Sequence, residues 1–269
     1  MHYQAIALLA AAAATKVAGA PEPKPSNVLG PFFPDGFVPA AGGALDPSVT
    51  PPPSLGSGDV HAERAKTMTV TFANHDYYKL HLAHVRGADS PPPIGFGNDG
   101  APDAHLEVGG HQVLKFPAGY HGATYMNIET PGHHITGQDE SLIENSFVDQ
   151  GNGEAAGDID VSYVNGFSRA ATCVCRDSRK LAVGCSKNLW QMGNCPDNNN
   201  AGSCRNPKRH DKEATSPTAF FAPCDFHGGA FTYPEADANT LNYKCPSENY
   251  YCCIGNDDYC RKFNDNPRD

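Results

Sequence analysis

Residues 141–175 read SLIENSFVDQGNGEAAGDIDVSYVNGFSRAATCVC and hold the strongest structural pattern in the chain. Apolar and polar residues alternate along residues 142–148 and again along residues 159–164. This period of two is typical of strands that are buried on one face only. Three glycines in residues 151–157 permit the chain to reverse between the runs without Cβ strain. The sequence therefore predicts a β-hairpin.

This hairpin would bring three acidic side chains together. Glu144 belongs to the first run, and Asp158 and Asp160 belong to the second. Residues two apart on a strand share a face, so Asp158 and Asp160 project to the same side of the sheet. We expect Glu144 to lie near both.

Composition limits the classes of function. A chain of 269 residues with 39% hydrophobic content can bury one sizeable core, with a smaller lobe beside it. The formal net charge of −10 argues against a nucleic-acid partner, because phosphate binding needs clustered Lys and Arg. No apolar stretch is long enough to predict a transmembrane segment.

The N-terminal region has the pattern of a secretory signal. Residues 5–14 are apolar and residues 18–20 are small, which predicts a signal peptide over residues 1–20. Residues 21–62 are rich in Pro and Gly and predict a pro-segment or linker. The folded domain is expected to occupy residues 63–269.

All cysteines lie at or beyond the end of the central stretch. An even number of cysteines behind a signal peptide predicts five disulfides in a secreted, extracellular protein, with the pairing left open. The adjacent Cys252 and Cys253 are expected to pair with different partners. The ten cysteines are Cys173, Cys175, Cys185, Cys195, Cys204, Cys224, Cys245, Cys252, Cys253 and Cys260.

Short runs rich in β-forming residues precede the central stretch. A hairpin is predicted around Gly109 and Gly110, and the regular pattern fades after residue 172. The prediction is an all-β protein, with a β-sandwich over residues 63–172 and an irregular, disulfide-rich lobe over residues 173–269. The runs are residues 67–72, 78–85, 104–108, 111–116 and 123–128.

The order of these motifs resembles the thaumatin-like family of secreted proteins, the osmotin and zeamatin kind, in a divergent fungal form. LIE at residues 142–144 with DVSYVNGF at 160–167 is the closest match, similar to the family's L-A-E-F and Y-D-V-S-x-V-D-G-F-N. Further similar segments are TVTFAN at 69–74, EVGGH at 107–111, FPAGYHG at 116–122, FAPC at 221–224, AFTYP at 230–234 and YCC at 251–253.

The resemblance implies a thaumatin-like β-sandwich whose acidic cleft binds β-1,3-glucan and sometimes hydrolyses it weakly. The family's cleft glutamate falls on Glu144 and one of its aspartates on Asp160. A second aspartate falls on Asn165, which cannot ionise, and the cleft arginine falls on Ala123. Asp158 is a candidate to replace the lost carboxylate.

Glu144 and Asp160 are thus the candidate catalytic pair, because glycoside hydrolysis needs one protonated acid and one ionised carboxylate. The missing arginine and aspartate favour binding without strong turnover. Aromatic rings pack against the apolar faces of pyranose rings, which makes nearby tyrosines candidate contacts. The candidate carbohydrate-binding residues are Asp158, Asn165, Tyr120, Tyr125 and Tyr163.

The hypothesis is a monomeric secreted protein that binds a cell-wall polysaccharide such as β-glucan. One alternative is an effector or antimicrobial protein that binds a surface protein of a host or competitor. Another is a weak endo-β-1,3-glucanase. No cofactor or metal is expected. His81 and His84, for example, are three apart on a predicted strand, so they face opposite sides and cannot chelate one ion together.

Overall fold

The computed structural model describes residues 67–94, 103–149, 154–177, 182–236, 241, 245–256 and 259–260. The predicted signal peptide, the Pro-rich segment and residues 150–153 of the predicted glycine turn lie outside them. Within the described part, the chain forms twelve strands, one helix (α1, Leu189–Met192) and one 3-10 turn (η1, Ala222–Cys224). The prediction of an all-β protein is confirmed.

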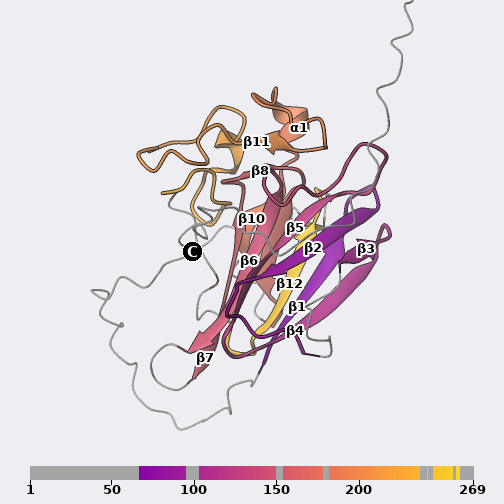
Figure 1. The fold of residues 1–269 in the computed structure, drawn as a ribbon, viewed down its shortest axis with the longest axis vertical. Helices are drawn as coiled ribbons and strands as arrows, with labels where there is room; N and C mark the ends of the chain where they lie inside the picture. The colour runs from indigo at the N-terminus through magenta and orange to yellow at the C-terminus, as the bar shows by residue number, and fades with distance from the viewer. Residues whose placement is uncertain are drawn as a thin grey trace, which may run out of the picture.

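The first sheet joins the two ends of the described chain. Its strand order is β10 (Ala182–Cys185), β9 (Ala171–Cys175), β12 (Asn249–Ile254), β1 (Thr67–Asn74) and β4 (His111–Pro117). β1 runs parallel to β12, while the other neighbours are antiparallel. Figure 1 shows this pairing as the indigo-purple β1 beside the yellow β12.

The second sheet contains the predicted central hairpin. Its order is β3 (Ala104–Leu106), β2 (Leu80–Arg86), β5 (Tyr120–Ile128), β6 (Ser141–Asp149) and β7 (Ala155–Ser162), with every pair antiparallel. β6 and β7 form the hairpin, which is confirmed.

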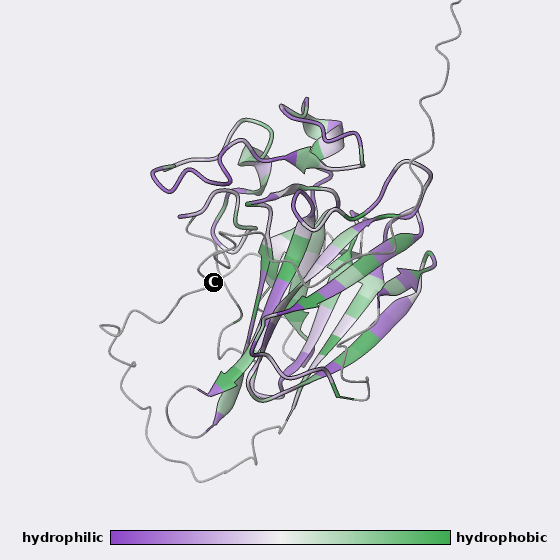
Figure 2. Ribbon diagram, in the orientation of Figure 1, coloured by the Kyte–Doolittle hydropathy of each residue, from purple (hydrophilic) through white to green (hydrophobic). Residues whose placement is uncertain are grey.

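One hydrophobic core receives side chains from both sheets. Period-two alternation sends every second residue of each strand into it, and Figure 2 shows green and purple alternating along the strands. Full burial of each such side chain contributes about 1.5–3 kcal/mol relative to exposure. Contributors include Met68, Val70 and Phe72 from the first sheet and Leu80, Leu82, Ile143, Phe147, Ile159 and Val161 from the second.

The hairpin predicted around Gly109 and Gly110 is wrong. β3 pairs with β2 and β4 pairs with β1, so the intervening turn crosses from one sheet to the other. The buried Asn74 side chain explains this path, because its Nδ2 donates to Leu106 O at 2.9 Å and to Tyr78 O at 2.9 Å. The Asn74 amide therefore binds both connections between the sheets, the one from β1 to β2 and the one from β3 to β4.

The predicted boundary between sandwich and lobe at residues 172/173 also needs correction. It falls inside β9, and β9, β10 and β12 supply three of the five strands of the first sheet. β9 is buried at all five positions, so it lacks the alternation that marks a half-buried strand. Its Cys173 is bonded to Cys252 at the directly opposite position on β12.

The described structure pairs all ten cysteines, which confirms the prediction of five disulfides, a number typical of extracellular proteins. The adjacent Cys252 and Cys253 have different partners, as expected. The bonds are Cys173–Cys252, Cys175–Cys245, Cys185–Cys224, Cys195–Cys204 and Cys253–Cys260. Among the described residues, no helix has the length and apolar character needed to cross a membrane.

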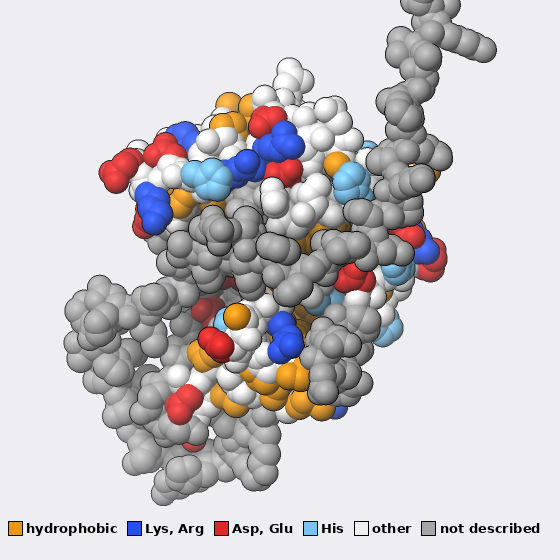
Figure 3. Space-filling model, in the orientation of Figure 1, with side chains coloured by type: hydrophobic (Ala, Val, Ile, Leu, Met, Phe, Trp, Pro, Cys, Tyr) orange, Lys and Arg blue, Asp and Glu red, His pale blue; other side chains and the backbone are white. Residues whose placement is uncertain are grey.

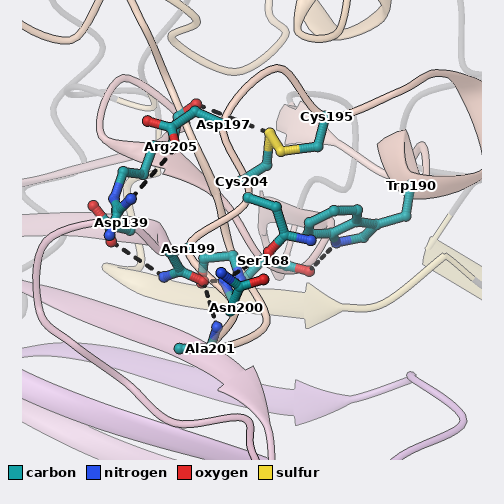
Figure 4. Close-up of a disulfide and its surroundings, with 12 residues drawn as sticks. Asp139, Ser168, Trp190, Cys195, Asp197, Asn199, Asn200, Ala201, Cys204 and Arg205 are labelled. Atoms are coloured by element: carbon teal, nitrogen blue, oxygen red, sulfur yellow. Dashed lines mark hydrogen bonds and ion pairs between the residues drawn. A yellow bond between two sulfur atoms is a disulfide. The ribbon is translucent and has the colours of Figure 1, made fainter. Parts of the chain in front are cut away.

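An irregular lobe lies at one end of the sheets, with β8 (Gly166–Phe167), β11 (Cys204–Arg205) and α1 (Figure 1). Asp139, which is 4% exposed, anchors it. Its carboxylate accepts Arg205 Nε at 3.0 Å, Arg209 Nη1 at 2.8 Å and Asn199 Nδ2 at 3.1 Å. Figure 4 shows Asp139 with Arg205 and Asn199 beside the Cys195–Cys204 disulfide. Asp139 therefore joins the lobe to the start of β6.

We expect Asp139→Ala to lower the free energy of unfolding by about 1–3 kcal/mol. Breaking a fully buried pair costs about 3–5 kcal/mol, and the partial exposure of the two arginines, 38% and 29%, reduces that cost. Urea denaturation with the disulfides intact measures the change. Asp197→Ala is the matched control, because Asp197 is 50% exposed and contacts the same Arg205, so its loss should cost about 0–1 kcal/mol. Equal effects of the two substitutions would contradict the anchoring role.

Candidate functional site

Three carboxyl groups meet on the outer face of the second sheet. Ile143 and Phe147 point into the core, so Glu144, between them in the alternation, points outward. Glu144 is paired directly with Asp160 on β7. Asp158 lies two residues before Asp160 on the same face. We call Glu144, Asp158 and Asp160 the acidic cluster, and its formation agrees with the sequence prediction.

Glu144 and Asp160 occupy directly paired positions on neighbouring strands. Asp160 is 4% exposed and Glu144 is half-buried. Glu144 Oε2 and Asp160 Oδ1 are buried and have no hydrogen-bond partner within the described part of the chain. Buried polar atoms normally have hydrogen-bond partners, so these two acceptors are candidate contacts for a ligand.

Burial is the main cause of altered acidity in this pair. It raises the pKa of Glu144 to about 8, and the negative charge of Asp158 adds to the effect, while the hydrogen bond from Asp160 opposes it. Burial and the charge of Glu144 raise the pKa of Asp160 well above its ordinary value. Two carboxylates in contact cannot both ionise cheaply, so the pair retains a proton at neutral pH.

An apolar patch borders the acidic cluster. Ala123 lies directly opposite Glu144 on β5, so the position expected to hold an arginine offers only a methyl group. Tyr125 lies on the same face, next to Leu142, and is 2% exposed. Burial raises its pKa, and the charge of Glu144 contributes, which places its hydroxyl near the acidic cluster. The patch consists of Ala83, Val85, Ala123, Tyr125, Ile135 and Leu142.

A second set of contacts fixes the acidic strand β7 to the first sheet. Gly157 N donates to Glu248 Oε2 at 2.9 Å, and the Tyr250 hydroxyl donates to Gly157 O at 3.2 Å. A Cβ atom at position 157 would lie 2.4 Å from Glu248 Oε2, so this approach requires glycine. The sequence alone gave no sign of it, because the partners lie in distant parts of the chain.

All three candidate tyrosines are buried. Tyr120 is 1% exposed and packs on Phe116, with ring centroids 4.2 Å apart. Tyr163 is fully buried, and its hydroxyl donates to Cys185 O at 2.9 Å. Tyr125 is 2% exposed. None of the three rings is available to stack on a sugar, and that prediction is corrected here.

The remaining candidate, Asn165, follows the end of β7, where its carbonyl accepts the backbone N–H of Asn206 at 3.1 Å. It therefore lies at the junction with the lobe. The strongly exposed tyrosines are instead Tyr77 and Tyr78, at 76% and 51%, in the connection between β1 and β2. The sequence prediction placed Tyr78 in the strand run 78–85 and gave neither tyrosine a role.

Glu140 shows how a structural carboxylate differs from the acidic cluster. It is completely buried, but its oxygens accept the backbone N–H groups of Thr136, Gly137, Gln138 and Asp139. The donors satisfy the carboxylate and close the turn before β6. Glu144 and Asp160 lack such donors among the described residues.

No protein-family model matches the chain, and no curated protein matches it either. The chemistry of the site therefore rests on its geometry.

The raised pKa of Glu144 predicts that the protein becomes less stable as the pH rises. Between the ordinary value of 4.5 and the folded value of about 8, the folded state binds more protons than the unfolded state. The free energy of unfolding should therefore fall across this interval, by at most about 1.4 kcal/mol per pH unit for each proton.

The clearest window for this measurement is pH 6.5–8. Below pH 6.5 the half-buried His84 acts in the opposite direction, because burial lowers its pKa from 6.5 to about 4 and acid then favours unfolding. Chemical denaturation across this window should give a shallower slope for Glu144→Gln than for the native chain. Equal slopes would show that Glu144 ionises normally.

Proposed function

We propose that this is a secreted, disulfide-stabilised protein of the thaumatin-like β-sandwich type that binds cell-wall β-glucan without hydrolysing it. The observation that carries the proposal is the Glu144–Asp160 pair beside an apolar patch, because one buried oxygen of each acid has no hydrogen-bond partner among the residues that the structure describes. The five disulfides support an extracellular location.

The retained proton favours a neutral, hydroxyl-rich ligand. A protonated carboxyl group donates one hydrogen bond, and the remaining oxygens of the pair accept others. Each sugar hydroxyl likewise donates and accepts, so the two match. A divalent cation such as Ca²⁺ would need ionised oxygens and would first have to displace the proton that burial holds on the pair.

The neighbouring apolar patch matches the apolar C–H faces of a sugar ring. Carbohydrate sites combine a few placed polar groups with apolar surface, because a pyranose has C–H faces as well as hydroxyl edges. Ala123 and Leu142 flank Glu144 on the outer face.

Binding without turnover follows from the contact between the two acids. Hydrolysis requires an acid and a base on opposite sides of one bond. Here the two groups bind each other, and the pair lacks the cation that would hold one of them ionised.

Co-sedimentation with insoluble β-1,3-glucan, chitin and cellulose tests the proposal, with release of reducing sugar measured in the same tubes. We expect selective retention on β-1,3-glucan and no sugar release. Glu144→Gln and Asp160→Asn should each weaken retention about tenfold or more, since loss of one buried hydrogen bond costs about 1–3 kcal/mol. Both substitutions keep the shape of the protonated acids, so the fold should persist.

Glu107→Gln is the matched control, because this carboxylate is 77% exposed and lies in the turn between β3 and β4. It should bind like the native chain. If Tyr77→Ala or Tyr78→Ala abolishes retention while the acid variants bind normally, the acidic cluster is not the site. Retention on none of the polymers would overturn the carbohydrate proposal, and sugar release would overturn the absence of turnover.

A further inference from the structure

Two histidines form a pair at the opposite edge of the second sheet. His81 on β2 and His105 on β3 occupy directly paired positions, and their rings stack with centroids 4.7 Å apart and planes 8° apart. Their side chains are 21% and 52% exposed. Figure 3 shows histidine, acidic and basic side chains gathered where β3 lies in Figure 1.

Each imidazole is held by its own carboxylate. His81 Nε2 lies 3.2 Å from Asp103 Oδ2, and His105 Nδ1 lies 2.8 Å from Glu129 Oε2. A carboxylate contact keeps the imidazole proton on the nitrogen that faces it, which leaves the lone pair on the other nitrogen. Those other nitrogens, His81 Nδ1 and His105 Nε2, take no hydrogen bond from any residue that the structure describes.

We propose that His81 and His105 bind one divalent transition-metal ion of the Zn²⁺, Ni²⁺ or Cu²⁺ class. Neutral imidazole is the side chain that these ions prefer, and metal-bound histidines usually donate their second N–H to a carboxylate, as both do here. Two nitrogens on one Zn²⁺ lie about 3.3 Å apart, from Zn–N bonds of about 2.0–2.1 Å. The stacked rings would have to tilt toward each other to reach this spacing, and their exposures of 21% and 52% leave room for that movement.

The surrounding charge favours a cation. Lys79 Nζ lies 3.1 Å from Glu107 and 3.6 Å from Glu129. The three carboxylates of Asp103, Glu107 and Glu129 against the single ammonium of Lys79 leave two negative charges beside the neutral imidazoles. A surface field of this sign raises the local concentration of divalent cations.

His75 is the other histidine beside potential ligands, and it does not compete as a site. It lies near the sulfurs of Cys253 and Cys260, but these are bonded to each other and offer no thiolate. The histidine pair on β2 and β3 therefore remains the stronger candidate among the described residues, and it is separate from the acidic cluster.

Titration of the tag-free, disulfide-intact protein with ZnCl₂ tests the proposal, with calorimetry to give the affinity. A long-range ¹H–¹⁵N spectrum of the imidazoles should identify His81 Nδ1 and His105 Nε2 as the nitrogens that bind the metal. We expect His81→Gln and His105→Gln each to abolish this binding. Asp103→Asn and Glu129→Gln should weaken it about 10- to 100-fold, the usual effect of removing a carboxylate that orients a ligand.

His111→Gln and His134→Gln are the matched controls, because both histidines are exposed and neither belongs to β2 or β3. They should bind Zn²⁺ like the native chain. The proposal is overturned if the native chain takes up no Zn²⁺, or if His81→Gln and His105→Gln bind it as tightly as the controls. Circular dichroism of each variant verifies the fold, and loss of the pair's metal signal in a correctly folded His105→Gln chain supports the site.

Discussion

The parallel pairing of β1 with β12 is the constraint on which the structure depends. It joins the first and last long strands, so the first sheet cannot form until distant parts of the chain meet. The Cys173–Cys252 bond ties β12 to β9 at directly opposite positions and shortens the loop that must close. The second sheet, whose β5, β6 and β7 follow one another in sequence, needs no such closure and suits early formation.

The acidic cluster depends on both sheets. β7 is the edge strand of the second sheet, and the contacts of Gly157 with Glu248 and Tyr250 fasten it to the start of β12. Buried carboxyl groups oppose folding, and the cost is offset by the opposite face of the same strands, where Ile143 and Phe147 enter the core. The energetic cost of burying these acids is thus offset by the apolar face of the same two strands.

Local pattern predicted the central hairpin, because alternation and glycines specify both strands and the shared face of Asp158 and Asp160. Predictions from the local pattern were wrong where contacts between residues distant in sequence determine the structure. The crossing between β3 and β4 follows from Asn74, and β9 is buried on both faces. The tyrosine error was avoidable: Tyr120 and Tyr125 are five residues apart on one strand, so only one of them can share the face of Glu144.

Carboxyl groups lie at two edges of the outer face of the second sheet, in two different chemical environments. At the β6–β7 edge, burial keeps a proton on the acids, because Asp160 is only 4% exposed. At the β2–β3 edge, Asp103 and Glu129 are 40% and 38% exposed, so water and neighbouring cations stabilise their charge. The first edge therefore suits neutral hydroxyl groups, and the second holds imidazole lone pairs ready for a metal ion. The carboxyl groups of the two sites therefore differ in depth of burial rather than in residue type.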